Sequence, residues 1–306
     1  MPASIEGKWN LTSLAIQKIA NKQTQDELAT GRSDFPTEIA VTETPRVVHR
    51  QLTDHQKAPH RAAEADSLGC VFSCGICPAH DLSLCAGMRM VGLEADWIAG
   101  TSPVTSSNHM IPARRTICHP KEWSDFIPII CQGWAASSVT LLDGRRQILS
   151  FLLPGDLVST AGLLEPMSGR TVEAITDVTC RKFVRNELKA FLFQRPHLLE
   201  KLSKTWVEER TQADQLALDL GRRTADERIA RLILTLADRL AKRNMVSGQT
   251  MEFPLRQRHI ADATGLTPVH VSKVLGEFQR AGLVEINRRS LTLINETELR
   301  RAADWR

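Results

Sequence analysis

Short apolar runs separated by turn residues make up most of residues 109–185. Runs at 127–131, 139–142, 148–153 and 171–175 are each followed by a turn sequence, such as Asp143-Gly144 after the second run. Asp-Gly between two strand-like runs is a strong signal for a β-hairpin. Short strands at such even spacing predict a compact antiparallel barrel or roll.

After Pro196 the period of the apolar positions changes to that of a helix. The spacing alternates between three and four residues, as in the seam of a two-stranded coiled coil. We therefore expect a helix over residues 197–220 that pairs with a second copy of the chain; the alternative is an amphipathic helix packed on its own domain. The predicted seam consists of Leu199, Leu202, Trp206, Glu209, Ala213, Leu216 and Leu220. A Glu209 carboxylate facing its own copy would weaken the pairing unless another contact supported it.

Residues 254–294 have the spacing of a helix-turn-helix followed by a hairpin. Gly265 supplies the tight turn, and Thr267 caps a second helix with Pro268 at its first position, where a missing amide costs nothing. On this second helix, the residues expected to face inward are Val271, Val274, Leu275 and Phe278. The outward residues, which are the candidates for contacts in the major groove of DNA, are Val269, His270, Ser272, Lys273 and Arg280.

A basic hairpin tip follows the predicted second helix. Apolar runs at 283–286 and 291–294 flank Asn287-Arg288-Arg289-Ser290, which predicts a winged helix-turn-helix. We expect Arg288 and Arg289 to contact DNA phosphates, and Ser272 and Lys273 to contact base edges. The alternative for the whole segment is a set of helices that contacts another protein.

Composition narrows the class of protein. A chain of 306 residues corresponds to about two domains at roughly 100 to 200 residues each. The net charge is +4, and residues 222–306 carry the excess, with 16 Lys and Arg against 10 Asp and Glu. Such an excess favours an acidic partner such as DNA. No run approaches the roughly 20 apolar residues of a membrane span, and the first residues lack a signal-peptide pattern, so we expect a cytoplasmic protein.

Cysteines are concentrated in one short segment. Four of the seven, Cys70, Cys74, Cys77 and Cys85, fall within sixteen positions. In a reducing cytosol, such a group favours a metal site or redox chemistry over a disulfide framework. Soft thiolate ligands suit an iron-sulfur cluster or zinc, and a Cys-x2-Cys pair fits either. Zinc held by Cys74, Cys77, Cys85 and either Cys70 or His80 is therefore one possibility, and an inert or purely thiol-redox group is another.

The order of these features resembles the Crp/Fnr superfamily of bacterial transcription regulators, and within it the Fnr-type oxygen sensors. The resemblance covers roughly residues 68–296, and its most specific stretches are LDGRRQILSFLLPGD at 142–156 and GLTPVHVSKVL at 265–275. It implies an α+β protein with an N-terminal double-stranded β-helix, which is a β-roll like that of cyclic-nucleotide-binding domains. A long dimerisation helix and a C-terminal winged helix-turn-helix would follow.

The resemblance also sets the expected domain boundaries. We expect a mobile leader at 1–66, a cysteine-rich cluster-binding segment at 67–90, a β-roll sensor domain at 91–190, a dimerisation helix at 191–221, and the winged helix-turn-helix DNA-binding domain at 222–306.

Fnr-type members hold a 4Fe-4S cluster with three cysteines near the N-terminus and one in the roll. By position, the ligands here would be Cys74, Cys77, Cys85 and Cys180. The gap before Cys85 is longer than the usual spacing, which leaves Cys70 as an alternative to it. A closed zinc site has no use for a cysteine some 95 positions further on, whereas a cluster that spans leader and roll does. The alternative for Cys180 is a small buried hydrophobe.

The resemblance implies a regulator that senses oxygen through this cluster and binds a palindromic promoter site as a homodimer under low oxygen, with RNA polymerase as a further partner. The alternative is the same fold responding to zinc, to thiol redox state or to a small ligand in the roll. Val269 and Lys273 stand where Fnr-type members usually have Glu and Arg, so the expected site is a related palindrome, and the Fnr-type half-site does not follow from the resemblance.

Two further functions are not expected. Crp-type members bind a cyclic nucleotide through a Gly-Glu pair and an Arg-Ser/Thr pair; Arg170-Thr171 is present here, but residues 157–162 contain no Glu. An enzyme would need a nucleophile with a base and an oxyanion site, and no such motif is present, so we expect neither nucleotide binding nor catalysis.

Overall fold

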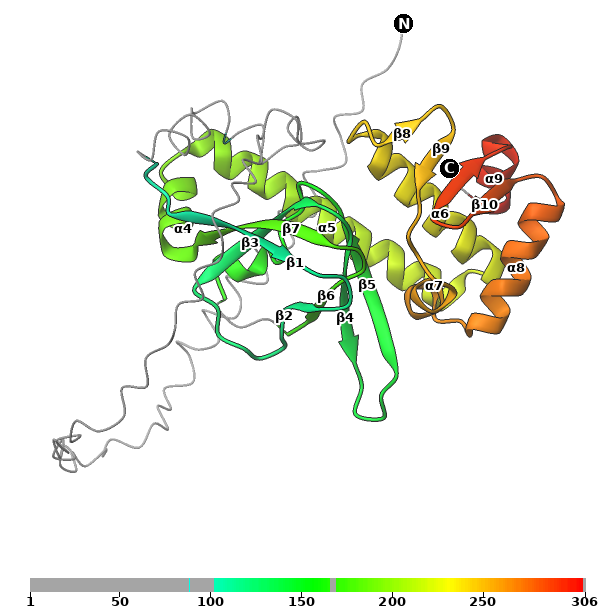
Figure 1. The fold of residues 1–306 in the computed structure, drawn as a ribbon, viewed down its shortest axis with the longest axis horizontal. Coiled ribbons are helices and arrows are strands. Elements are labelled where there is room, and N and C mark those ends of the chain that lie inside the picture. Colours follow the sequence, from blue (N-terminus) through cyan, green and yellow to red (C-terminus); the bar gives the residue numbers. More distant parts are fainter. Residues whose placement is uncertain (1–87, 89–101, 166–168, 305–306) are drawn as a thin grey trace, which may run out of the picture. The chain divides into compact units, whose positions relative to one another are not determined.

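The computed structural model describes residues 88, 102–165 and 169–304 (Figure 1). Cys70, Cys74, Cys77 and Cys85, which are the predicted cluster ligands near the N-terminus, lie outside these residues. Among the helices of the described residues, none is long and apolar enough to cross a membrane.

The first described domain is an antiparallel β-roll, as the spacing of the apolar runs predicts. One sheet has the strand order β1-β7-β3 and the other has the order β2-β6-β4-β5. The elements are β1 (Ser106–Ile111), β2 (Thr116–Cys118), β3 (Phe126–Gln132), β4 (Ala135–Thr140), β5 (Arg146–Leu152), the short helix η2 (Ala161–Leu163), β6 (Thr171–Ala174) and β7 (Val178–Val184).

The hairpin at Asp143-Gly144 is confirmed, but its first strand begins earlier than the apolar run at 139–142 predicts. Strand β4 ends at Thr140, and it buries Ser137 and Ser138, two polar residues that the hydrophobic pattern does not mark. Leu142 is fully exposed beyond the end of the strand. Gly144 has a φ of +87°, so this tight turn needs the conformational freedom of glycine.

The roll has its own apolar interior, which is made by both sheets. Ile130, Val178 and Cys180 come from the first sheet, and Ala135, Leu152, Val172 and Ala174 come from the second. A second cluster lies where Ile127, Ile129 and Phe183 of the first sheet meet two helices, α4 (Arg185–Phe193) and α5 (Pro196–Arg222). Since alternate residues of a strand point to opposite faces, β3 and β7 of the first sheet bury residues on both sides, whereas most of β1 is exposed.

Helix α5 is the long helix predicted for 197–220, and its first residue is Pro196. Its inner face buries Leu198 and Leu202 against the roll. The helix ends at Arg222, and Thr224 then starts the next helix with a capping box, in which its hydroxyl accepts from the Glu227 amide and the Glu227 carboxylate accepts from the Thr224 amide.

The C-terminal domain, α6 to α9, is a winged helix-turn-helix. Its elements are α6 (Ala225–Ala241), β8 (Val246–Ser247), β9 (Thr250–Glu252), α7 (Gln257–Thr264), α8 (Pro268–Arg280), β10 (Val284–Asn287), β11 (Ser290–Leu293) and α9 (Glu296–Ala302), with the strand order β10-β11-β9-β8. Its core is continuous with the roll, because Trp134, Ile148 and Phe151 pack in the same cluster as residues of α6, α7 and α8.

Candidate nucleic-acid interface and candidate cluster ligand

Helix α8 is placed by the turn that precedes it. Gly265 adopts a left-handed conformation with φ of +67°, and a Cβ at this position would lie 3.1 Å from the Leu220 side chain. The Thr267 hydroxyl accepts a hydrogen bond from the His270 amide at 3.2 Å, and Pro268 occupies the first turn, where it has no amide to satisfy. The four residues predicted to face inward, Val271, Val274, Leu275 and Phe278, are all buried.

The outer face of α8 is free in the described residues of the chain. All five predicted groove residues, Val269, His270, Ser272, Lys273 and Arg280, are exposed. Val269, at the start of the helix, is 81% exposed. The Lys273 ammonium is 4.0 Å from the Glu277 carboxylate, at the limit of an ion pair, so it remains able to reach a base edge.

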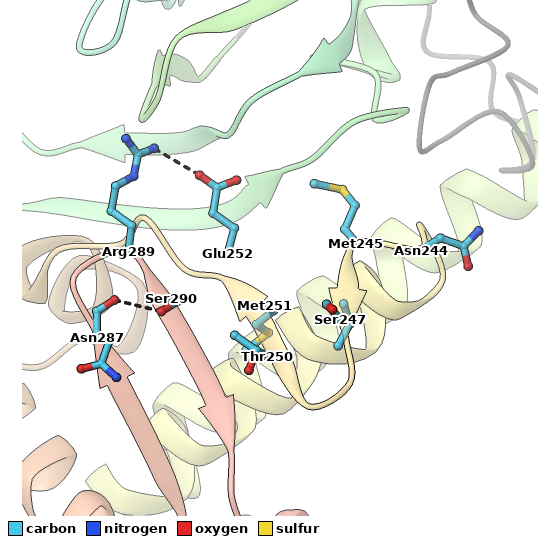
Figure 2. A pocket seen from close by; sticks show the side chains of 10 residues that line it. Asn244, Met245, Ser247, Thr250, Met251, Glu252, Asn287, Arg289 and Ser290 are labelled. Atoms are coloured by element: carbon cyan, nitrogen blue, oxygen red, sulfur yellow. Dashed lines mark hydrogen bonds and ion pairs between the residues drawn. The ribbon is translucent and has the colours of Figure 1, made fainter.

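Arg288 and Arg289 lie at the turn between β10 and β11, where Asn287 pairs with Ser290. Figure 2 shows Arg289 beside Asn287 and Ser290. Arg288 has a φ of +49°, which L side chains rarely adopt, and both arginines are exposed. The guanidinium of Arg289 is 3.2 Å from the Glu252 carboxylate, and a groove of about 440 Å³ lies beside this pair. A phosphate that approaches Arg289 must therefore compete with Glu252, whereas no carboxylate within the described part of the chain pairs with Arg288.

The structure of helix α5 differs in part from the predicted dimer seam. Leu202 is fully buried in its own chain and cannot line a contact with a second copy, so the prediction for this residue was wrong. The Glu209 carboxylate accepts a hydrogen bond of 2.5 Å from the Thr160 hydroxyl of its own roll. Burial raises the pKa of this carboxyl. The contact that was required to support Glu209 thus comes from the same chain.

The other seam positions of α5 differ in how far they are buried. Leu199 and Trp206 are half-buried against the roll cluster, and Leu216 and Leu220 are also half-buried. Ala213 is exposed. Two apolar side chains outside the predicted seam are exposed as well, Val207 at 65% and Leu218 at 42%. The spacing of three and four residues therefore marks mostly the face that packs on its own chain, which is the alternative left open above.

Cys180 is the one predicted cluster ligand within the described residues. It lies on β7 between His109 of β1 and Ile130 of β3, and its thiol is fully buried in the roll interior. Burial raises the pKa of this thiol, so a free thiolate is disfavoured there. Binding to iron offsets that charge, and the soft sulfur fits a cluster; the site fits a small apolar core residue equally well. Around it, the described residues contain no group of three or more potential metal ligands.

The sequence did not indicate the contacts that join the roll to the C-terminal domain. Arg146 of β5 donates to Asp262 of α7 at 2.8 Å and to Glu173 of β6 at 2.9 Å. Asp156 accepts from Arg239 of α6 and from Arg243, which follows the end of that helix, both at 2.6 Å. The partners are far apart in the chain, and the only sequence signal is that Arg146 and Asp156 lie in the specific stretch at 142–156.

The structure combines a β-roll, a long helix and a winged helix-turn-helix whose second helix has an exposed outer face. This combination defines a class of transcription regulators in which a β-roll is joined to a DNA-binding domain. Residues 109–195 match the cyclic nucleotide-binding domain, and residues 227–302 match the Crp-like helix-turn-helix domain. The chain belongs to the Crp/Fnr family of transcription regulators, whose members are not enzymes.

Individual relatives agree with this assignment. The chain is 27% identical over 226 residues to the transcriptional activator protein FnrL of Cereibacter sphaeroides, covering 73% of this chain and 88% of the relative. It is 34% identical over 166 residues to the transcriptional activatory protein AadR of Rhodopseudomonas palustris, covering 54% and 68%. The solved structure of FixK2 from Bradyrhizobium japonicum is similar, with a TM-score of 0.58 and 28% identity over 65% of this chain and 97% of that one.

Proposed function

We propose that this regulator responds to oxygen through a 4Fe-4S cluster held by Cys74, Cys77, Cys85 and Cys180, with Cys70 as the alternative to Cys85. The observation that carries the proposal is the position of Cys180 on the central strand of its sheet, where β1 and β3 pair with β7 on both sides. A strand held at both edges fixes the sulfur in place. The similarity to FnrL supports the same assignment.

Within this proposal, Cys180 is the attachment point in the roll, and the other three cysteines belong to the cysteine-rich segment. A bound cluster would supply a redox-sensitive link between the two. The roll contributes an apolar surrounding that keeps water from the Cys180 sulfur, and solvent exposure is one of the factors that set the potential of such centres.

We further propose that the protein forms a homodimer through the exposed face of α5 and binds DNA in that form. The large apolar side chains exposed on this face are Val207 and Leu218. Two copies of the C-terminal domain would then present two α8 helices to one palindromic site. Arg288 and Arg289 are assigned to phosphates, Ser272 and Lys273 to base edges, and Val269 to a thymine methyl group. RNA polymerase is the expected further partner at a promoter.

The test starts with full-length protein purified without air. We expect brown protein with iron and acid-labile sulfide in near-equal amounts, and we expect Cys180→Ser to lose most of both. Cys131→Ser is the matched control, because Cys131 is a half-buried cysteine on the neighbouring strand β3. Colourless protein that contains zinc would favour the alternative of a zinc-responsive regulator.

DNA binding is measured on the same preparations by fluorescence anisotropy. The probe is a duplex that the air-free wild-type protein selects from a randomised pool, so that no operator has to be assumed. We expect the selected sequence to be palindromic and its affinity to fall after exposure to air. Equal affinity of cluster-containing and cluster-free protein would contradict the oxygen response and leave a regulator that responds to thiol state or to another ligand.

A further inference from the structure

Arg146 connects three segments that are distant in the sequence. It lies on β5 of the roll, and its guanidinium is mostly buried between Glu173 of β6 and Asp262 of α7. The next side chain along β5, Gln147, donates to the carbonyl of Ala263 at 3.1 Å. Two consecutive roll residues thus hold the last turns of α7, the first helix of the helix-turn-helix. Because the planar fork of arginine can satisfy two carboxylates at once, Lys could not replace it in this role.

This contact leaves the surface for DNA open. The outer side chains of α8 and the tip of the wing stay exposed while α7 is held by the roll. Arg146 also neutralises Asp262, a carboxylate on the helix that crosses the DNA backbone in a helix-turn-helix. The held arrangement is therefore compatible with DNA binding and lowers the repulsion between this helix and phosphates.

Strand β6 connects the same contact to the interior of the roll. Val172 and Ala174 point into the cluster that contains Cys180, while Glu173 between them points outward to Arg146. A change in the packing around Cys180 thus reaches α7 through one strand residue and one arginine. This connection consists of contacts present in the structure, and an energetic coupling along it is measurable.

We propose that Arg146 is a positioning residue for DNA recognition: it fixes the orientation of α7 and α8 relative to the roll and thereby the distance between the two α8 helices of a dimer. The proposal rests on DNA binding as a homodimer, which is part of the proposed function. Arg146 does not touch the DNA. Its contribution is to keep the C-terminal domain in the arrangement that fits both half-sites.

The variants are Arg146→Gln, Asp262→Asn and the double variant, all in the full-length chain purified without air. Arg145→Gln is the matched control, because Arg145 is the neighbouring arginine and its recorded partner is Asp143 at the exposed hairpin tip. Affinity is measured for the duplex selected by the wild-type protein, and for the same duplex with one base pair added between the half-sites.

We expect Arg146→Gln and Asp262→Asn each to weaken binding about tenfold, which is the size expected for a charged hydrogen bond when the competent arrangement becomes less populated. The double variant should bind no more weakly than Arg146→Gln alone, because that change already removes the contact between Arg146 and Asp262. The penalty for the inserted base pair should be smaller in the variants than in the wild type. A residue with a purely structural role would lower affinity for both duplexes equally.

Three results would overturn the inference: equal affinities of Arg146→Gln and Arg145→Gln, additive losses in the double variant, or an unchanged penalty for the inserted base pair. Circular dichroism checks the fold, and if Arg146→Gln fails to fold, the isosteric Asp262→Asn carries the test. If the wild-type protein selects no palindromic duplex, the proposed function fails. If it selects one and the variants bind it as the wild type does, only the role of Arg146 fails.

Discussion

Asp156 connects the roll to the C-terminal end of α6 and the segment after it, and replacing it with Asn should destabilise the protein. Its carboxylate accepts hydrogen bonds from Arg239 and Arg243, each at 2.6 Å, and from the amide of Leu153 at 2.8 Å. Asn keeps the size of the side chain but removes the negative charge. Two arginines would then be left near a neutral group at the junction of two domains.

The magnitude follows from burial. The side chains of Asp156, Arg239 and Arg243 are 21%, 16% and 7% exposed. Breaking a buried ion pair by removing one partner costs about 3–5 kcal/mol, whereas an exposed pair contributes about 0–1 kcal/mol. Because about a fifth of Asp156 is in contact with solvent, we expect a loss of about 2–4 kcal/mol for Asp156→Asn. A domain with a typical stability of about 5–15 kcal/mol would lose a large share of it.

Urea unfolding followed by tryptophan fluorescence measures this loss, since Trp134 is fully buried in the core shared by the roll and the C-terminal domain. Asp143→Asn is the control: Asp143 and its partner Arg145 are 53% and 78% exposed. We expect this control to change stability much less than Asp156→Asn does, because an ion pair in contact with solvent contributes little. Equal losses for the two variants would refute the reasoning, because they would show that the buried arginines do not depend on the charge of Asp156.

Three further predictions concern single side chains. Arg288→Ala should reduce the slope of log affinity against log salt by about one, as expected for one lost phosphate contact, and titrations at several salt concentrations measure this slope. Thr224→Ala should cost about 1 kcal/mol in urea unfolding, because α6 loses its capping box. Burial raises the pKa of Glu209, so the folded chain favours the neutral carboxyl. This contribution is complete below the ordinary pKa and is lost as the pH rises through the raised one. The stability of the wild type relative to Glu209→Gln should therefore fall as the pH rises above the ordinary carboxyl range, which a series of thermal melts at increasing pH can measure.

The winged helix-turn-helix could be predicted from the sequence because its signals are local. Gly265, Thr267 and Pro268 fix the turn and the start of α8 within four positions, and the inward positions of α8 follow the helical period. The exposure of Val269 and Lys273 then follows from the same period, and the structure confirms it. A turn residue and a cap act through their own backbone, so they need no knowledge of the rest of the fold.

The contacts between the roll and the C-terminal domain could not be predicted in this way. Arg146 meets Asp262 across 116 positions, and Asp156 meets Arg243 across 87. A charged residue in a hairpin or a turn carries no mark of its distant partner, and most such residues face solvent. The buried Ser137 and Ser138 show the same limit, because their strand is enclosed by its neighbours although its residues are polar.

The apolar stripe of α5 can be identified from the sequence, but the sequence does not show whether the roll or a second copy covers it. An apolar stripe indicates that one face of a helix is covered, and it does not say by what. On α5 the roll covers the face with Leu198 and Leu202 and holds Glu209 through Thr160, so the exposed face with Val207 and Leu218 is left for a second copy. In the homodimer proposed above, the contact of Glu209 with the roll and the contact with a second copy would therefore share one helix. A change at Thr160 is then expected to affect dimer formation without touching the dimer surface itself.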